Sequence, residues 1–102
     1  MNGAERIMAE RARQIEEEGW TPEHDDEHGD GELAIVAACY AMTPSVREMR
    51  IWESTLPRHL WPPSWSWSWF KPSQSYDGRI RDLEKAGALC AAEIDRLLRA
   101  TG

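Results

Sequence analysis

The sequence predicts an all-α fold, a small bundle of three to four helices with one long loop rich in tryptophan and proline. Two patterns carry this prediction. Apolar residues recur at three-to-four spacing near both ends of the chain, which is the period of an amphipathic helix. Four of the six prolines fall within residues 54–75, where a regular helix cannot continue. Because 102 residues suffice for one core, we expect a single helical domain over residues 1–102.

The first helix is expected over residues 4–18, which are strong helix formers. Gly19 should end it, since glycine readily adopts the left-handed conformation of a helix end. Thr21 followed by Pro22 is typical of a helix start, so residues 22–28 are expected to form short helical turns. The residues expected to face the core from the first helix are Met8, Ala12 and Ile15.

The middle of the chain is expected to hold a buried helix followed by a second one. Residues 31–42 have almost no polar face, so this helix should be central, with Asp30 as its N-cap. Thr43 followed by Pro44 repeats the helix-start pattern and predicts a helix over residues 44–53. The core-facing residues of that helix would be Val46, Met49 and Trp52.

The last helix is expected to begin with Asp77 as its N-cap and to run to about residue 100. Its apolar residues form one stripe at helical spacing, and we expect this stripe to pack against the helix of residues 31–42. Gly87 lies within the stripe and predicts the close approach of another helix. The stripe consists of Ile80, Leu83, Gly87, Cys90, Ile94 and Leu97.

Charge and composition limit the classes of function. The net charge is −6, which argues against nonspecific binding to nucleic acid or to anionic membranes, because such binding depends on basic residues. No apolar run approaches the roughly 20 residues of a membrane span, and the first residues are too charged for a signal peptide. We therefore expect a cytoplasmic protein, with Cys39 and Cys90 as reduced thiols in the core. Short helices often associate to complete a core, which predicts a homo-oligomer.

An acidic segment with two histidines is the sharpest local feature, since residues 23–32 hold six carboxylates and two imidazoles. In a helix His24 and His28 would share a face that could hold a divalent metal ion, and such an ion activates water for hydrolysis. The alternatives are a solvated acidic turn that caps helix ends and a contact with a basic partner. The metal-ligand candidates are His24, Asp25, His28 and Glu32, and the catalytic candidates are His24, Asp25, Asp26 and His28.

Tryptophans and basic residues gather in the second half of the chain. In an extended segment Trp65, Trp67 and Trp69 would lie on one side and could stack on a base. Basic residues follow them and open the last helix, where arginine and lysine could hold a phosphate. The alternatives are an aromatic lid over the core and exposed charges beside a buried stripe. The ligand-binding candidates are Trp65, Trp67, Trp69, Lys71, Arg79, Arg81 and Lys85.

Four segments of the chain resemble a family of small proteins encoded by phages and prophages: ERARQIEEEGWTPEHDDEH, GELAIVAACYA, WPP…W…FKP and RDLEKAGALCAAEIDRL. Together they cover nearly the whole chain, and the resemblance implies a phage-type accessory protein. The acidic helices are also similar, more distantly, to those of the all-α nucleoside triphosphate pyrophosphohydrolases, which hold Mg²⁺ with E-x-x-E and E-x-x-D motifs on long helices. The E-x-x-D pairs of this chain, Glu23 with Asp26 and Glu27 with Asp30, lie instead in a turn bounded by glycine and proline.

These features together predict a protein that binds a nucleotide or a nucleotide-derived signal. One form of the hypothesis is sequestration of a signal of host defence, with tryptophans on the base and basic side chains on phosphate. A second form is a metal-dependent nucleotide hydrolase that uses the acidic segment. A third class is an acidic inhibitor of a host nucleic-acid-binding complex, in which residues 16–32 replace phosphate charge.

Overall fold

The computed structural model of the chain describes residues 1–101, with every side chain among them except that of Tyr76. The predicted mostly helical fold is confirmed, since the strands among these residues form one short antiparallel hairpin. The helices are more numerous than predicted, because the middle of the chain forms several short ones. The elements in chain order are α1 (Gly3–Glu18), α2 (Pro22–Asp26), α3 (Glu32–Ala41), α4 (Pro44–Arg47), β1 (Arg50–Ile51), β2 (Ser54–Thr55), α5 (Leu56–Leu60), the 3₁₀ helix η1 (Trp67–Trp69) and α6 (Tyr76–Thr101).

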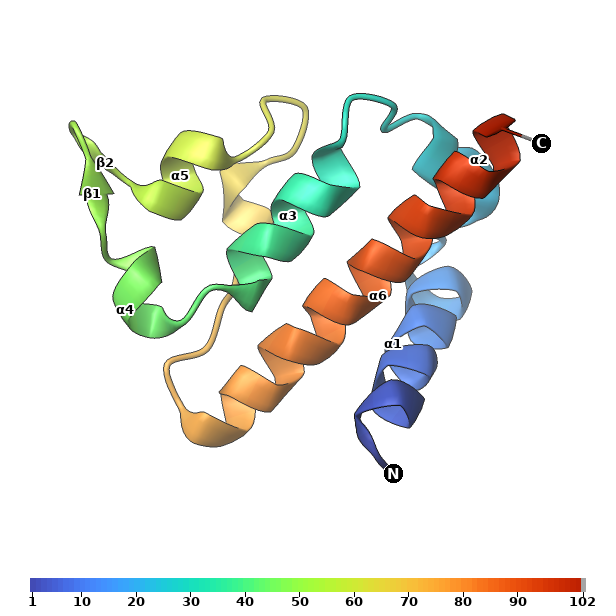
Figure 1. Cartoon of the computed structure of the whole chain (residues 1–102), viewed down its shortest axis with the longest axis horizontal. Helices are drawn as coiled ribbons and strands as arrows, with labels where there is room; N and C mark the ends of the chain where they lie inside the picture. Colours follow the sequence, from blue (N-terminus) through green and yellow to red (C-terminus); the bar gives the residue numbers. More distant parts are fainter. Residues whose placement is uncertain (102) are drawn as a thin grey trace.

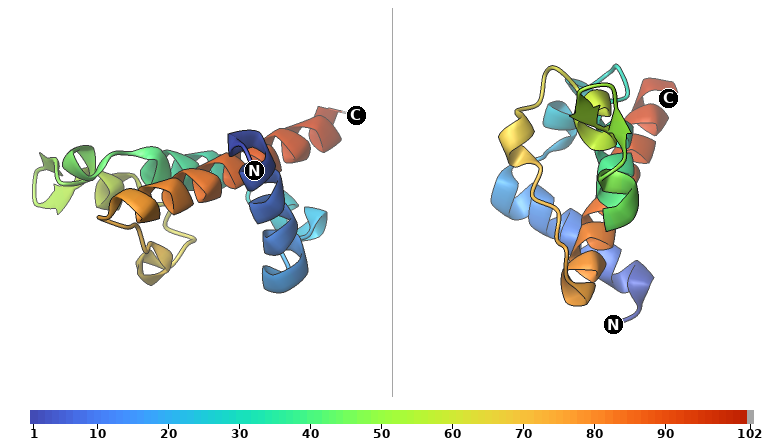
Figure 2. Two further views of the ribbon diagram at one scale, coloured as in Figure 1. Left: turned by 90° about the horizontal axis from the view of Figure 1, so that it is seen from below. Right: turned by 90° about the vertical axis from the view of Figure 1, so that its left-hand side faces the viewer.

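The long helix α6 organises the molecule. Helix α3 lies along one side of α6, and α1 lies along its other side (Figure 1). Seen from below, α1 and the segment that contains η1 project to the same side of the pair formed by α3 and α6 (Figure 2). One broad face of α3 and α6 is therefore flanked by these projecting elements, whereas the opposite face is left uncovered along much of its length.

The ends of α1 and α2 follow the sequence signals. Asn2 and Glu5 form a reciprocal capping box at the start of α1, and Gly19 ends the helix with φ of 72°. The hydroxyl of Thr21 accepts a hydrogen bond from the backbone N–H of His24, with Pro22 in the first turn of α2. The predicted boundaries at Gly19 and Thr21 are thus confirmed.

The predicted caps of α3 and α6 are wrong. Gly31 occupies the N-cap position of α3 with φ of 83°, and the backbone N–H of Asp30 donates to the Glu32 carboxylate over 2.7 Å. At the start of α6 the hydroxyl of Ser75 accepts from the N–H of Gly78 over 3.0 Å. Local side-chain hydrogen bonds therefore start both helices one or two residues away from the predicted aspartates.

The predicted helix over residues 44–53 is also wrong beyond its first turn. Helix α4 ends at Arg47, and a hairpin follows in which Ile51 pairs with Ser54. Trp52 lies at the tip of the hairpin with φ of 58° and is 91% exposed, while Met49 is 57% exposed. Two-residue hairpin turns need positive φ, which usually selects glycine or asparagine, so a tryptophan there gives no turn signal.

The core is built from α3, α6 and residues 61–71, which we call the tryptophan segment. Helix α6 contributes small residues and Leu89, while α3 contributes its larger apolar residues. The buried apolar cluster consists of Leu33, Val36, Ala37, Cys39, Tyr40, Trp61, Trp65, Ala86, Leu89 and Ala92.

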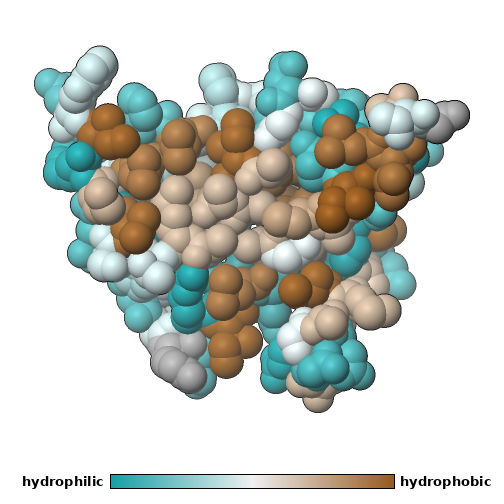
Figure 3. Space-filling view, viewed as in Figure 1, coloured by the Kyte–Doolittle hydropathy of each residue, from teal (hydrophilic) through white to brown (hydrophobic). Residues whose placement is uncertain are grey.

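The predicted apolar stripe of α6 does not lie in this core. Leu83 is 45% exposed and Ile94 is 57% exposed, and apolar side chains gather on the uncovered face over α3 and α6 (Figure 3). The side of α6 that is buried carries Asp82 and Glu93, each bonded to an arginine. Helix α6 does pack against α3, as predicted, but through the face adjacent to the stripe.

Helix α1 also buries a different face from the predicted one. Met8 is 70% exposed and Ile15 is 38% exposed, whereas Glu10 and Gln14 are buried. The predicted close approach at Gly87 is confirmed, because a methyl group at position 87 would lie 2.5 Å from Cδ1 of Ile7 in α1. Polar pairing therefore decides which face of α1 turns inward, and the glycine decides how closely the two helices approach.

Both cysteines are free, as predicted, but only Cys39 is buried, whereas Cys90 is exposed on α6. Burial raises the pKa of the Cys39 thiol to about 11. None of the helices between residues 1 and 101 combines the length and apolar composition needed to cross a bilayer.

Candidate ligand-binding cavity

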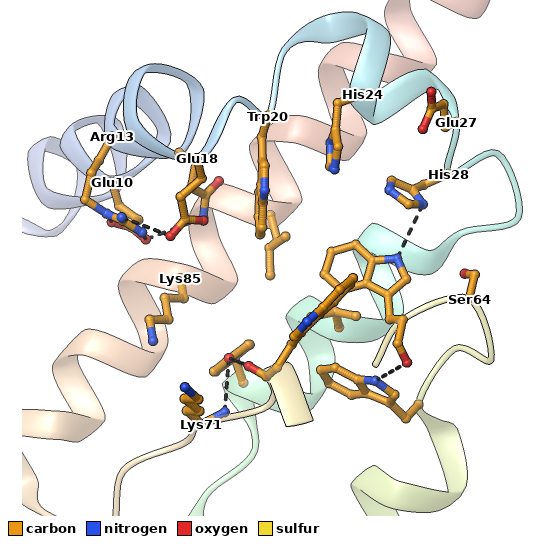
Figure 4. A pocket seen from close by; sticks show the side chains of 17 residues that line it. Glu10, Arg13, Glu18, Trp20, His24, Glu27, His28, Ser64, Lys71 and Lys85 are labelled. Atoms are coloured by element: carbon orange, nitrogen blue, oxygen red, sulfur yellow. Dashed lines mark hydrogen bonds and ion pairs between the residues drawn. The ribbon is translucent and has the colours of Figure 1, made fainter. Parts of the chain in front are cut away.

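A cavity of about 630 Å³ lies between the end of α1, helix α2 and the segment of residues 61–71 (Figure 4). Val36 and Tyr40 from α3 and Leu89 from α6 contribute to its lining, so it is built against the core. Its volume falls within the range of small-molecule sites, about 300–1,000 Å³. The cavity brings together parts of the chain that are far apart in sequence.

Tryptophans give the cavity its aromatic walls, since its lining includes Trp20, Trp61, Trp65 and Trp69. Trp65 lies between Trp20 and Trp69, with ring centroids 5.8 and 5.6 Å away and both contacts edge-to-face. Trp20 also stacks on His24, with centroids 5.5 Å apart and an interplanar angle of 7°. Both rings point into the cavity from the side of α1 and α2 (Figure 4). Flat aromatic faces of this kind suit a planar ligand.

Trp67 does not join these walls, which corrects the predicted slab of three tryptophans. Its ring packs against Trp61 and Phe70 at centroid distances of 5.4 and 5.3 Å, and the guanidinium of Arg58 lies 4.9 Å from its ring centroid. The strict alternation of side chains holds only for an extended chain. In the 3₁₀ helix η1, which has three residues per turn, Trp67 and Trp69 instead point in different directions.

Hydrogen bonds fix the aromatic segment in place. The indole N–H of Trp61 donates to the carbonyl of Trp65 over 3.0 Å. The hydroxyl of Tyr40 donates to the carbonyl of Trp69 over 3.2 Å and accepts from the backbone N–H of Lys71 over 3.3 Å. These bonds tie the loop to the buried helix α3, so the walls are formed before any ligand arrives.

The two histidines of the acidic segment lie at one end of the cavity, with ring centroids 4.9 Å apart. Nδ1 of His24 lies 3.2 Å from the Asp25 carboxylate, which is fully buried and also bound by Arg11 over 2.7 Å. Nδ1 of His28 lies 3.1 Å from the Glu32 carboxylate. In each histidine a carboxylate orients the ring through Nδ1, which leaves Nε2 as the other polar atom.

His28 has two competing partners on the same nitrogen. The indole N–H of Trp65 also lies 3.3 Å from His28 Nδ1. An indole only donates and a carboxylate only accepts, so the tautomer of His28 selects between Trp65 and Glu32. The ring therefore links the acidic segment to the aromatic wall.

The predicted metal ligands do not converge. Between residues 1 and 101, no group of three His, Cys, Asp or Glu side chains is placed to share one metal ion. Asp25 is engaged by Arg11, and Glu32 accepts from the backbone N–H of Asp30 as well as facing His28. Asp26, a catalytic candidate, points away to Arg99 of α6, 2.8 Å away. The acidic segment thus forms separate pairs that hold α2 in place, and its candidates are not assembled into one centre.

Two lysines line the cavity opposite the acidic segment. Lys71 comes from the loop and Lys85 from α6, and neither forms an ion pair with any of the described side chains. The ammonium of Lys85 lies 5.3 Å from the ring centroid of Tyr40. Burial, helped by the nearby charge of Arg81, lowers the pKa of Lys85. The cavity lining therefore includes two ammonium groups outside the ion pairs of the described residues, together with the carboxylates of Glu10, Glu18 and Glu27.

Arg79 and Arg81, also predicted to hold a ligand, have structural partners instead. Arg79 donates to the carbonyls of Tyr40 and Met42 over 2.9 and 2.8 Å and also to that of Ala41, so it caps the end of α3. Arg81 binds the carboxylate of Glu10 over 2.7 Å. Neither arginine lines the cavity, and both fasten α6 to its neighbours.

Helix α1 supplies a wall that the sequence reasoning missed. Arg13 bridges Glu10 and Glu18 at 2.7 and 3.0 Å, and all three line the cavity. Burial alone would raise the pKa of Glu10, but hydrogen bonds from Arg13 and Arg81 outweigh it and lower that pKa. The signal in the sequence is the spacing of Glu10, Gln14 and Glu18, which recur every four residues on one face of the helix.

Gln14 is the least satisfied polar group of this wall. The residue is 2% exposed, and its amide N lies 3.5 Å from the Glu10 carboxylate. Its amide oxygen has no hydrogen-bond partner among the described residues. A buried acceptor without a partner is costly, so a ligand that donates to it would gain affinity.

Comparison with protein-family models, with curated proteins and with solved structures gives no match. What the cavity can bind therefore follows from its residues. They define a preformed site with aromatic walls, two lysines without carboxylate partners and a buried amide oxygen.

Proposed function

We propose that this protein binds a nucleotide, or a signal derived from one, in the cavity between α1, α2 and the tryptophan segment. One observation carries the proposal: tryptophan faces and two lysines without partners open into the same cavity. A base can stack on an indole for about 1–3 kcal/mol, and a lysine ammonium attracts a phosphate. A nucleotide combines a flat ring with concentrated negative charge, which matches both features.

The lysines would bind the phosphate end. Lys85 is partly buried, and burial lowers its pKa although the charges of Asp82 and Glu10 act in the opposite direction. A phosphate beside the ammonium would add a further negative charge that stabilises its protonated form. Arg13 is already held by Glu10 and Glu18, so it shapes the wall and leaves Lys71 and Lys85 as the anion-binding pair.

Gln14 would contribute to selection of the base. Its amide oxygen is an acceptor without a partner in the described part of the chain, and the residue lines the cavity. Bases with an exocyclic amino group carry a donor for such an oxygen. A nucleotide with an amino-bearing base is therefore expected to bind more tightly than the matching nucleotide with a keto group.

Sequestration is the form of this function that the geometry favours. The candidates for a hydrolytic metal centre are split into separate pairs across residues 1–101. A phage-type protein that captures a signal of host defence would need a tight, preformed site and no turnover.

Hydrolysis remains the second candidate because of one observation. His24 lies 3.2 Å from the buried carboxylate of Asp25, an arrangement that orients imidazole as a general base. A hydrolase would release product from the bound nucleotide, whereas a sequestering protein would return it intact. Incubation with an excess of each nucleotide, followed by chromatography, separates the two.

The third candidate, an acidic inhibitor of a nucleic-acid-binding complex, rests on the end of α1. Glu16, Glu17 and Glu18 are all exposed there, and Arg13 is their only basic neighbour among the described ion pairs. Reversal of these three charges would abolish such an interaction. It would change nucleotide binding far less, because only Glu18 lines the cavity.

The test is a fluorescence titration of the protein with nucleoside mono-, di- and triphosphates and cyclic dinucleotides. Stacking should quench the tryptophans, and Trp65→Ala or Trp69→Ala should each lose about 1–3 kcal/mol of affinity. The matched control is Trp52→Ala, since Trp52 is 91% exposed on the hairpin and outside the cavity. A panel that gives no quenching, or equal losses for all three variants, would contradict nucleotide binding.

A further inference from the structure

Apolar side chains gather on the uncovered face of α3 and α6 (Figure 3). It lies on the broad side of the molecule, which has principal extents of 40 × 32 × 21 Å. Monomeric proteins rarely expose contiguous apolar patches larger than a few hundred Å². The exposed large residues of α6 on or beside this face are Ile80 (41%), Leu83 (45%), Ile94 (57%), Leu97 (48%) and Leu98 (64%).

We call the apolar residues of α6 at this face the ridge; they are the predicted stripe from Ile80 to Leu97 together with Leu98. The spacing of the stripe is typical of a helix that packs along another helix. The stripe residues follow one another at intervals of three, four, three, four and three, from Ile80 to Leu97. This alternation keeps an apolar seam on one side of a helix over its whole length. Inside the chain Gly87 faces Ile7 of α1, because a Cβ at position 87 would lie 2.5 Å from Cδ1 of Ile7. The large residues of the seam, Ile80, Leu83, Ile94 and Leu97, are each at least 41% exposed.

Helix α3 offers the complementary surface beside the ridge. Its exposed positions are Ala34, Ala38 and Ala41, which lie four and three residues apart on one side of the helix. Alanines let another helix approach closely and form a shallow track. The face thus has two halves, a ridge of large residues on α6 and a track of small residues on α3.

We propose that a second copy of this chain covers this face. A two-fold axis running between α3 and α6 would lay the ridge of each copy on the alanine track of the other. A surface that contains both a shape and its complement can pair with itself in this closed way. A stable interface takes about 800 Å² from each partner, and this face lies on the broad side of a molecule whose two longest extents are 40 and 32 Å.

The cavities remain open in this arrangement. Lys85 of the cavity and Ile94 of the ridge are nine residues apart, which is about two and a half helical turns, so they point to opposite sides of α6. Self-association therefore leaves access to the proposed nucleotide site open. The dimer would present one cavity on each outer side.

The first test is the mass of the native protein in solution, measured by sedimentation equilibrium. The expected result is twice 11.7 kDa for the wild type and 11.7 kDa for Ile94→Asp. The matched control is Met49→Asp, because Met49 is also 57% exposed but lies between α4 and β1. Circular dichroism shows whether each variant stays folded, and Leu98→Asp repeats the test at a second ridge position.

The second test uses Cys90 as a reporter of coverage. Cys90 is exposed on the ridge in the single chain, whereas Cys39 is buried and serves as an unreactive internal control. Labelling of Cys90 by a bulky maleimide should slow as protein concentration rises, and Ile94→Asp should remove that dependence. A wild type that stays monomeric with fast labelling at every concentration would overturn the proposal. So would a different protein bound at this face in place of a second copy.

Discussion

The two sides of α6 differ in a way that runs against simple hydrophobicity. The side turned toward the rest of the molecule buries Asp82 and Glu93 beside alanines, and the side turned to solvent carries Ile94 and Leu98. Each buried carboxylate has an arginine at hydrogen-bond distance, Arg47 for Asp82 and Arg96 for Glu93. Pairing with arginine thus allows a carboxylate to be buried. An unbroken apolar stripe indicates a packing contact, but the partner can be the same chain or another molecule.

The buried side should show the largest effects. Arg47 is 6% exposed and binds Asp82 over 2.8 Å, so Arg47→Met would leave a buried carboxylate without its partner. We expect a loss of about 3–5 kcal/mol in the free energy of unfolding, measured by urea denaturation. The double variant Arg47→Met with Asp82→Leu should recover most of the loss. The exposed pair of Arg6 and Glu84 is the control, and Arg6→Met should cost less than about 1 kcal/mol.

Truncation of apolar residues compares the two sides directly. Leu89→Ala removes a side chain that is 1% exposed, and we expect a loss of about 2–5 kcal/mol in unfolding free energy. Ile94→Ala, at 57% exposure, should cost under about 1 kcal/mol when the protein is dilute. Equal losses at both positions in dilute protein would show that the ridge is part of the folded core.

Lys85 tests whether the cavity trades stability for binding. Lys85→Met should weaken an anionic ligand by about 1.5–3 kcal/mol, the value of a hydrogen bond to a charged group. Stability should be unchanged or higher, because the partly buried charge is removed. Burial lowers the pKa of Lys85 below 10.5, so the unfolded chain binds more protons between the two pKa values. The contribution of Lys85 to stability therefore increases as pH rises through that window, and this increase should be absent in the variant.

The smallest effect concerns the two thiols. With its pKa raised to about 11, Cys39 should be almost unreactive toward a disulfide reagent near pH 8, while exposed Cys90 reacts. The native chain should thus titrate one thiol and the unfolded chain two. Two reactive thiols in the native protein would show that α3 opens readily.

Much of the fold follows from local signals. Gly19 and Thr21 mark two helix boundaries, because each acts through its own backbone or its immediate neighbour. Gly87 marks a close contact because it has no side chain, although the sequence does not name Ile7 as the residue that it meets. The facing of α1 and α6 does not follow in this way. It depends on Glu10 meeting Arg81, a pair separated by 71 positions in the chain. No periodicity within one helix contains that information.

In the candidate site, too, some residues could be predicted from the sequence and others could not. Six predicted residues line the cavity, because their residue types alone indicate stacking or charge. They are Trp65, Trp69, Lys71, Lys85, His24 and His28. Glu10, Gln14 and Trp20 were not predicted, since polar residues on an amphipathic helix are ordinarily assigned to solvent. Arg79 and Arg81 were predicted as ligands, yet the backbone of α3 and the carboxylate of Glu10 occupy them.

The contact between Ile7 and Gly87 lies outside the cavity but determines the width of the cavity. Ile7 lies one turn before Glu10, so the distance at this crossing fixes how far the wall of α1 stands from α6. A methyl group at position 87 would displace α1 from α6 and so widen the cavity, without contact with any residue that lines it. Gly87 also belongs to the ridge, so a second copy pressing on this crossing would bear on Ile7. Occupancy of the ridge and ligand affinity would then be thermodynamically linked, each changing the other by the same factor.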